Sequence, residues 1–146
     1  MNHGEEEATS ARDEDFLYIA RALQEEPEEV AITLRTLLTD PLADVRVVPY
    51  LKGLLTDTTL CVLSIPYRYG EMRWLAAHAL RAEYDALGID DMIELHDVVR
   101  PLDFNEIYEL GRAADVAVSP PYPSALEMLA TLREAGKVPL DELCLG

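Results

Sequence analysis

Residues 56–88, TDTTLCVLSIPYRYGEMRWLAAHALRAEYDALG, join an apolar run, a tyrosine-rich turn and one long amphipathic segment. Gly88 is the residue type that commonly ends a helix, because it adopts the left-handed conformation without strain. The apolar side chains before it recur at the 3.6-residue spacing of one helix face. They are Met72, Leu75, Ala76, Ala79, Leu80, Ala86 and Leu87. The pattern predicts a helix from about Glu71 to Leu87.

The run before this helix is ambiguous. Residues 58–66, TTLCVLSIP, fit either a strand or a short buried helix, because a short apolar run has no period that separates the two. The following YRYG is expected to form a turn or loop. The segment 45–51 is also rich in β-branched residues and could be a strand, although a third helix over 42–55, kinked at Pro49, fits it too.

The other helices are expected from local signals. The first begins near Asp13, and Pro27 begins the second; Asp40 and Pro41 are expected to start the third. In the C-terminal part, a short helix is expected within 90–100 and an extended linker over 115–123. Asp103 is expected to cap a helix that starts at Phe104. Ser124 and Glu127 form a capping box for the last helix, which ends near Gly136.

The chain is strongly acidic. Its 146 residues contain 28 acidic and 12 basic side chains, a net charge of −16, and half of that charge falls in residues 1–30. Phosphates would repel such a surface, which argues against nonspecific binding to nucleic acid or to an anionic membrane. The length suits one domain. We expect residues 1–12 to be a disordered acidic tail and residues 13–146 to form a single helical domain.

Cys61 and Cys144 do not form a disulfide framework, and the acidic N-terminus lacks an apolar signal segment. We therefore expect free thiols and a cytoplasmic protein. His3, His78 and His96 are scattered without partners at metal-ligand spacing, and no phosphate-binding or nucleophile motif occurs. We expect no metal, no cofactor and no catalytic residue.

Two segments share a weak repeat. LRTLLTD at 34–40 is echoed by LKGLLTD at 51–57. Val45-Arg46 follows the first, and Met72-Arg73 with Ala76, Ala77, Ala79 and Leu80 follows the second. Over about residues 28–88 this pattern resembles HEAT and HEAT-like repeats, although the 58–71 segment is an insertion relative to their short turn. The resemblance implies stacked helix pairs that act as a binding scaffold.

The expected fold is therefore mainly α, with HEAT-like stacked helix pairs in one compact domain. The alternative is an α+β fold with a small sheet formed by residues 45–51, 58–65 and 115–118.

The strongest candidate for a binding site is IPYRYGEMRW, residues 65–74. Tryptophan, tyrosine and arginine dominate the energetics of many protein interfaces. The partner-binding residues are expected to be Tyr67, Arg68, Tyr69, Arg73 and Trp74. The competing interpretation is that a neighbouring helix covers Trp74 and the tyrosines border the core.

Glu83 falls in the middle of the apolar stripe of 71–87, where a carboxylate is costly unless it is paired. We expect a structural ion pair between Glu83 and Arg46, with Arg73 as the other possible partner. A perturbed buried carboxylate can also belong to an active site.

These observations favour a noncatalytic protein–protein interaction module that binds an unidentified, possibly basic, protein through the aromatic and arginine turn and an acidic surface. One alternative is an immunity- or antitoxin-like factor, or a DNA mimic, that neutralises a basic protein. The other is a small enzyme that uses a buried carboxylate such as Glu83.

Overall fold

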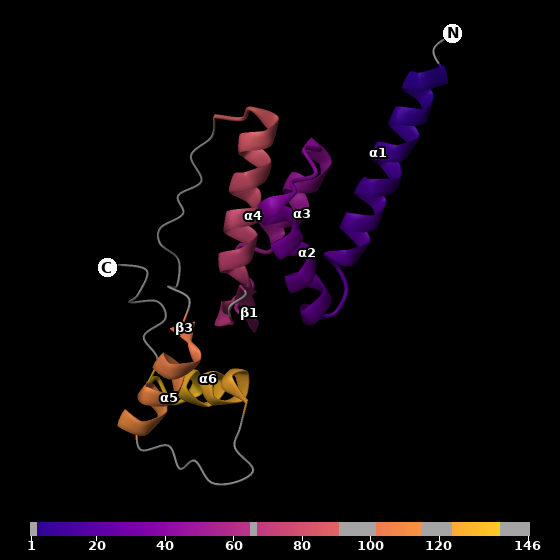
Figure 1. Ribbon diagram of the computed structural model, residues 1–146. Coiled ribbons are helices and arrows are strands. Elements are labelled where there is room, and N and C mark those ends of the chain that lie inside the picture. Colours follow the sequence, from indigo (N-terminus) through magenta and orange to yellow (C-terminus); the bar gives the residue numbers. More distant parts are fainter. Residues whose placement is uncertain (1–2, 65–66, 91–101, 115–123, 138–146) are drawn as a thin grey trace.

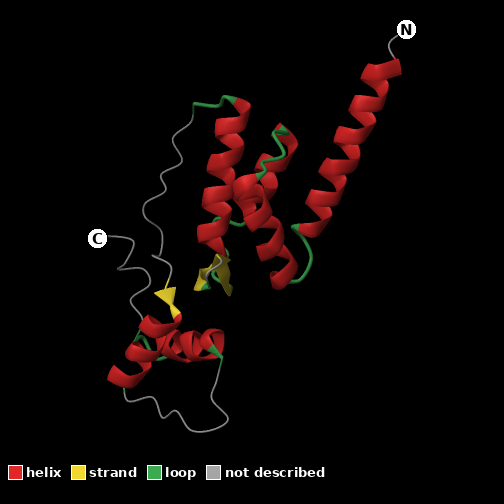
Figure 2. Ribbon diagram, viewed as in Figure 1, coloured by secondary structure: helices red, strands yellow, loops and turns green. Residues whose placement is uncertain are grey.

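The computed structural model of the protein describes residues 3–64, 67–90, 102–114 and 124–137, with side chains from residue 13 onward. Over these residues the fold is mainly helical with one small antiparallel sheet (Figures 1 and 2). The helices are α1 (His3–Ala22), α2 (Pro27–Thr39), the short 3₁₀ helix η1 (Val45–Val47), α3 (Val48–Gly53), α4 (Met72–Leu87), α5 (Phe104–Ala113) and α6 (Ala125–Glu134). The strands are β1 (Leu60–Ser64), β2 (Arg68–Glu71) and β3 (Leu102–Asp103).

The sheet fits the α+β alternative more closely than a fold of helix pairs alone. The apolar run forms strand β1, as one of its two interpretations predicted. The predicted strand 45–51 is wrong, because that segment forms η1 and most of α3. The third proposed strand, 115–118, lies outside the described residues. HEAT-like stacking of helix pairs stays a prediction.

The tyrosine-rich segment is part of the sheet rather than a loop. Strand β2 lies in the middle of the order β1-β2-β3, and both pairings are antiparallel. Gly70 lies close to Leu63 where β2 pairs with β1: a Cβ there would lie 2.7 Å from the Leu63 Cδ1 atom and would force that side chain to shift. This close approach brings the buried side of β1 against the start of α4.

Helix α4 is the centre of the larger hydrophobic core. Five of the seven predicted stripe residues are buried, from Met72 to Leu80, whereas Ala86 is exposed and Leu87 is half-buried. Gly88 ends the helix with a φ of 69°. Helices α2 and α3 and strand β1 pack against it, which Figure 1 shows as α2 and α3 lying beside α4. The core side chains with the least exposure are Leu34, Leu37, Val47, Leu51, Leu63, Met72, Leu75, Ala76, Ala79 and Leu80.

Three predictions for the N-terminal part need correction. Helix α1 begins at His3, so it extends through most of the segment that was expected to be a disordered tail. Asp40 does not cap a following helix; it lies at the C-terminal end of α2. Pro49 does not kink a long helix over 42–55, because it lies in the first turn of the much shorter α3, where its missing N–H is not needed.

The C-terminal helices form a second, smaller core. Asp103 caps α5 as the sequence predicts, and Glu106 completes a capping box with it. Of the capping box predicted for α6, the structure shows the hydrogen bond from the backbone N–H of Glu127 to the Ser124 side chain. Helices α5 and α6 approach closely at Gly111, where a Cβ would lie 3.0 Å from the Sδ atom of Met128. The buried side chains of this core are Leu102, Ile107, Ala125, Met128, Leu129 and Leu132.

A buried carboxylate joins the two parts of the fold. Glu71, at the end of β2, accepts from the Nε of Arg73 at 2.6 Å and from the Nη1 of Arg133 at 3.1 Å. Arg133 comes from α6 and also donates to the backbone carbonyl of Thr58, just before β1. Arg35 of α2 also donates to the sheet region, to the backbone carbonyl of Val62 in β1.

A helix can cross a membrane only if it is long and apolar enough to span the hydrocarbon core. Among the described residues, no helix has the length and apolar character needed to cross a membrane.

Candidate functional site

The first three residues of the predicted binding turn lie together on and beside β2. Tyr67 is 62% exposed, and its ring stacks on that of Tyr69 with centroids 6.4 Å apart. Arg68 is exposed between them in the sequence, whereas Tyr69 is half-buried and packs against the smaller core. Because side chains alternate along a strand, the Tyr67 and Tyr69 rings share one face of this strand end, and the exposed Arg68 side chain leaves from the other face.

The last two residues of the predicted turn lie apart from this group in the first turn of α4. The Arg73 guanidinium donates a hydrogen bond to the Glu71 carboxylate, and Arg73 is half-buried. Trp74 is half-buried, packs against the larger core, and lies over His78 with ring centroids 4.1 Å apart. The structure thus gives these two side chains neighbours within the fold, which matches the competing interpretation for Trp74 in part.

Two aromatic residues that the sequence did not suggest for binding join Tyr67 and Tyr69. Arg68 pairs with Asp103 across β2 and β3, so their chain neighbours Tyr67 and Phe104 lie at the same end of this ladder. Phe104 is 50% exposed, and the centroid of its ring lies 4.4 Å from that of Tyr108. We call Tyr67, Tyr69, Phe104 and Tyr108 the aromatic patch.

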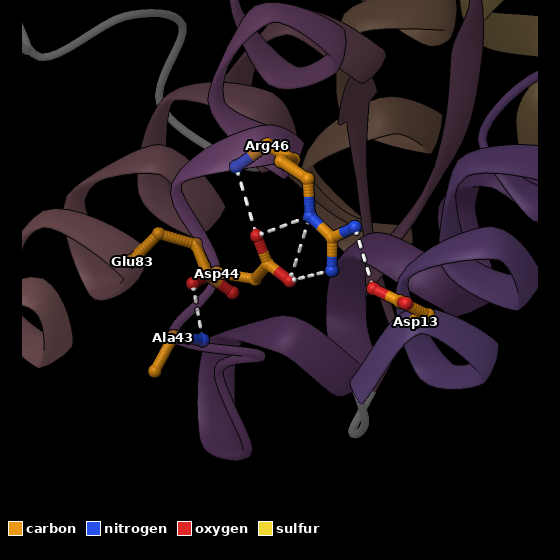
Figure 3. Close-up of polar contacts among 5 residues, drawn as sticks. All are labelled: Asp13, Ala43, Asp44, Arg46 and Glu83. Carbon is orange, nitrogen blue, oxygen red and sulfur yellow. Dashed lines mark hydrogen bonds and ion pairs between the residues drawn. The ribbon is translucent and has the colours of Figure 1, made fainter. Parts of the chain in front are cut away.

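Glu83 has its partners in the backbone rather than in an arginine. Its two carboxylate oxygens accept hydrogen bonds from the N–H groups of Leu42 and Ala43, at 2.5 and 2.7 Å. Figure 3 shows the contact with Ala43. The side chain is fully buried, at 0% exposure. Burial raises the pKa of Glu83 above its ordinary value of 4.5, and the hydrogen bonds from Leu42 and Ala43 partly oppose that rise.

The predicted ion pair between Glu83 and Arg46 is wrong, because Arg46 is directed at two other carboxylates. It contacts Asp44 at 2.6 Å and Asp13 of α1 at 2.8 Å, as Figure 3 shows. Its guanidinium also lies 4.4 Å from the centre of the Phe16 ring, a cation–π geometry. The hydrogen bonds that Arg46 donates to Asp44 and Asp13 raise its pKa. Arg46 therefore ties α1 to the loop before η1.

These contacts surround an open pocket of about 630 Å³ beside the loop. Residues of α1, the loop and η1 and the end of α4 line it: Asp13, Asp15, Leu42, Ala43, Asp44, Val45, Arg46 and Leu87. Glu83 is not part of the lining, since its oxygens face the backbone of the loop. The buried carboxylate that might have served an enzyme is thus separated from the pocket by the loop itself.

Metal ligands and nucleophiles are the other groups that could form a catalytic site. No group of three or more His, Cys, Asp or Glu side chains among the described residues is placed to hold a metal ion. Burial raises the pKa of the Cys61 thiol to about 12, and the thiol contacts the sulfur of Met72 at 3.9 Å. A thiol with such a pKa is protonated at neutral pH and is a poor nucleophile. Cys144 lies outside the described residues.

Comparison with known proteins adds no relative: no family model, no curated protein and no solved structure matches this chain.

Proposed function

We propose that this protein is a noncatalytic protein–protein interaction module that binds a partner protein through the aromatic patch with Arg68, assisted by its acidic surface. The observation that carries the proposal is the grouping of exposed Tyr67, exposed Phe104 and exposed Arg68 at one end of the β2–β3 ladder. Rings and guanidinium groups of this kind supply much of the energy of protein interfaces when a partner removes water from them.

The surroundings of Glu83 support a binding role over an enzymatic one. A general acid or base must reach its substrate, but this carboxylate is fully buried and its oxygens accept the N–H groups of Leu42 and Ala43. The free thiol of Cys61 is buried as well, which supports a cytoplasmic location for the protein.

A quantitative pull-down tests the proposal. Tagged wild type is compared with Tyr67→Ala, Arg68→Ala and Phe104→Ala, three changes at exposed positions of the surface. Ile32→Ala is the control, because Ile32 is an exposed apolar residue on α2, outside the aromatic patch. We expect a discrete partner to be retained by the wild type and the control and reduced about tenfold or more by the patch variants. Equal capture by all five proteins would exclude this surface.

A second candidate is the neutralisation of a basic protein, in the manner of an immunity or antitoxin factor or a mimic of DNA charge. The net charge of −16 supports it. Binding of this kind is dominated by long-range attraction, so its affinity would fall steeply as salt is raised. Capture that persists at about 0.5 M salt and still requires Tyr67 would favour the aromatic patch instead.

A further inference from the structure

A second surface lies between the end of α1 and the start of α2. A groove of about 400 Å³ opens there, lined by Tyr18, Arg21, Ala22, Glu25, Glu26 and Glu29. Tyr18 is 69% exposed, and the adjacent Leu17 is 59% exposed. The helical spacing of Tyr18 and Ala22 places one ring and one small side chain along the same side of α1, and Glu25 follows in the turn after the helix.

The charges that border this groove are not neutralised within the fold. Among the described residues, the carboxylates of Glu25, Glu26 and Glu29 form no ion pair. All three are exposed, and Arg21 is the one basic side chain of the lining. By contrast, Asp13 and Asp44 are committed to Arg46, and Glu71 is committed to two arginines. The α1–α2 groove therefore combines apolar contact area with uncompensated negative charge.

We propose that the α1–α2 groove binds a basic amphipathic segment of a partner protein, with an apolar side chain against Tyr18 and Ala22 and lysine or arginine side chains against Glu25, Glu26 and Glu29. Charge complementarity selects this occupant, because a second copy of this acidic chain would bring like charges together. The inference rests on the proposed binding function and names the partner chemistry of the acidic surface.

Fluorescence anisotropy of a labelled helical peptide with leucines on one face and lysines on the other tests this proposal with the full chain. We expect saturable binding that weakens about tenfold with Tyr18→Ala and with the double variant Glu25→Gln/Glu29→Gln. A peptide with serines in place of the leucines should bind about tenfold more weakly, because it lacks the apolar anchor.

The matched control is Glu109→Gln/Glu134→Gln, which removes the same charge from exposed positions of α5 and α6. It should retain affinity within about twofold, because the removed charges are remote and screened. Equal weakening by both double variants, equal binding of the serine peptide, or no binding would overturn the proposal.

The variant Tyr67→Ala separates this proposal from the proposed function. We expect it to bind the peptide as the wild type does, since Tyr67 belongs to the aromatic patch and not to the groove. Loss of peptide binding in Tyr67→Ala would overturn the groove assignment. If peptide binding is unchanged and all variants capture the partner equally in the pull-down, the groove proposal stands and the aromatic patch is excluded as a binding surface.

Discussion

The carboxylate of Glu83 in α4 accepts a 2.7 Å hydrogen bond from the backbone N–H of Ala43, forty residues earlier in the chain. Ala43 has a φ of 56°, the left-handed conformation that costs a residue with a Cβ of the order of 1 kcal/mol. In this conformation the loop presents the N–H groups of Leu42 and Ala43 to one carboxylate. Glu83 therefore fixes the path of the chain between α2 and η1.

Removing this carboxylate should destabilise the fold. We expect Glu83→Ala to lower the free energy of unfolding by about 2–4 kcal/mol, because two backbone donors lose their acceptor and a cavity forms in the core. Urea unfolding followed by circular dichroism measures the change. The control is Glu109→Ala at an exposed position of α5, which should stay within about 0.5 kcal/mol of the wild type. A cost no larger than that of the control would show that Glu83 does not hold the loop.

The stability should also depend on pH through Glu83. Its pKa in the folded state is raised above the ordinary value of 4.5, so the folded state binds this proton more tightly than the unfolded state. The stabilisation from this proton is complete below the unfolded pKa and is lost as pH rises through the folded pKa.

Relative to Glu83→Gln, which cannot titrate, the wild type should therefore lose stability as pH rises from below 4.5 toward neutral. Urea unfolding of both proteins over a series of pH values gives the difference. Glu109→Gln controls for the removal of one negative charge. Parallel profiles for the wild type and Glu83→Gln would contradict the prediction.

The contact between Glu71 and Arg133 should couple the two cores energetically. The Glu71 side chain is almost fully buried, so its charge depends on Arg73 and Arg133 for compensation. We expect a double-mutant cycle with Glu71→Gln and Arg133→Met to give a coupling of about 1–2 kcal/mol in the free energy of unfolding. A coupling below about 0.3 kcal/mol would mean that the smaller core is held to the sheet by apolar packing alone.

Two glycines offer a matched test of packing at the crossing of β1 and β2. Gly70→Ala should cost about 1–3 kcal/mol, because its Cβ would lie 2.7 Å from the Cδ1 of the buried Leu63. Gly53→Ala, where no atom lies within 4 Å of the new Cβ, should be neutral or stabilise by up to about 1 kcal/mol. Thermal unfolding compares the two. A similar change in both variants would refute the close approach.

Features with a local cause could be predicted from the sequence. The apolar period of α4, its end at Gly88 and the caps at Asp103 and Ser124 all depend on residues within a few positions of one another. Pro27 marked the start of α2 for the same reason. Each of these signals reflects a hydrogen bond or a backbone angle that is set within one turn of helix.

Features that depend on distant residues were missed or misassigned. The segment that became β2 is too short and too polar to predict a strand, and it is ordered by pairing with β1 and β3. The apolar period of α4 predicts that Glu83 is buried. It does not predict the hydrogen bonds from the backbone N–H groups of Leu42 and Ala43, because these lie about forty residues away in the chain. The exposure of Phe104 arises because α5 buries Ile107 and Gly111 instead.

The contact between Arg35 and the carbonyl of Val62 bears on how the molecule resists polymerisation. In the described sheet, β1 has a neighbouring strand on one side only, and such a border can recruit strands from other chains and begin fibril growth. Arg35 occupies one carbonyl of β1, and Arg133 occupies that of Thr58 just before it. An incoming strand would have to displace both guanidinium groups. Side chains from α2 and α6 therefore block the edge of β1 that has no neighbouring strand in the described sheet.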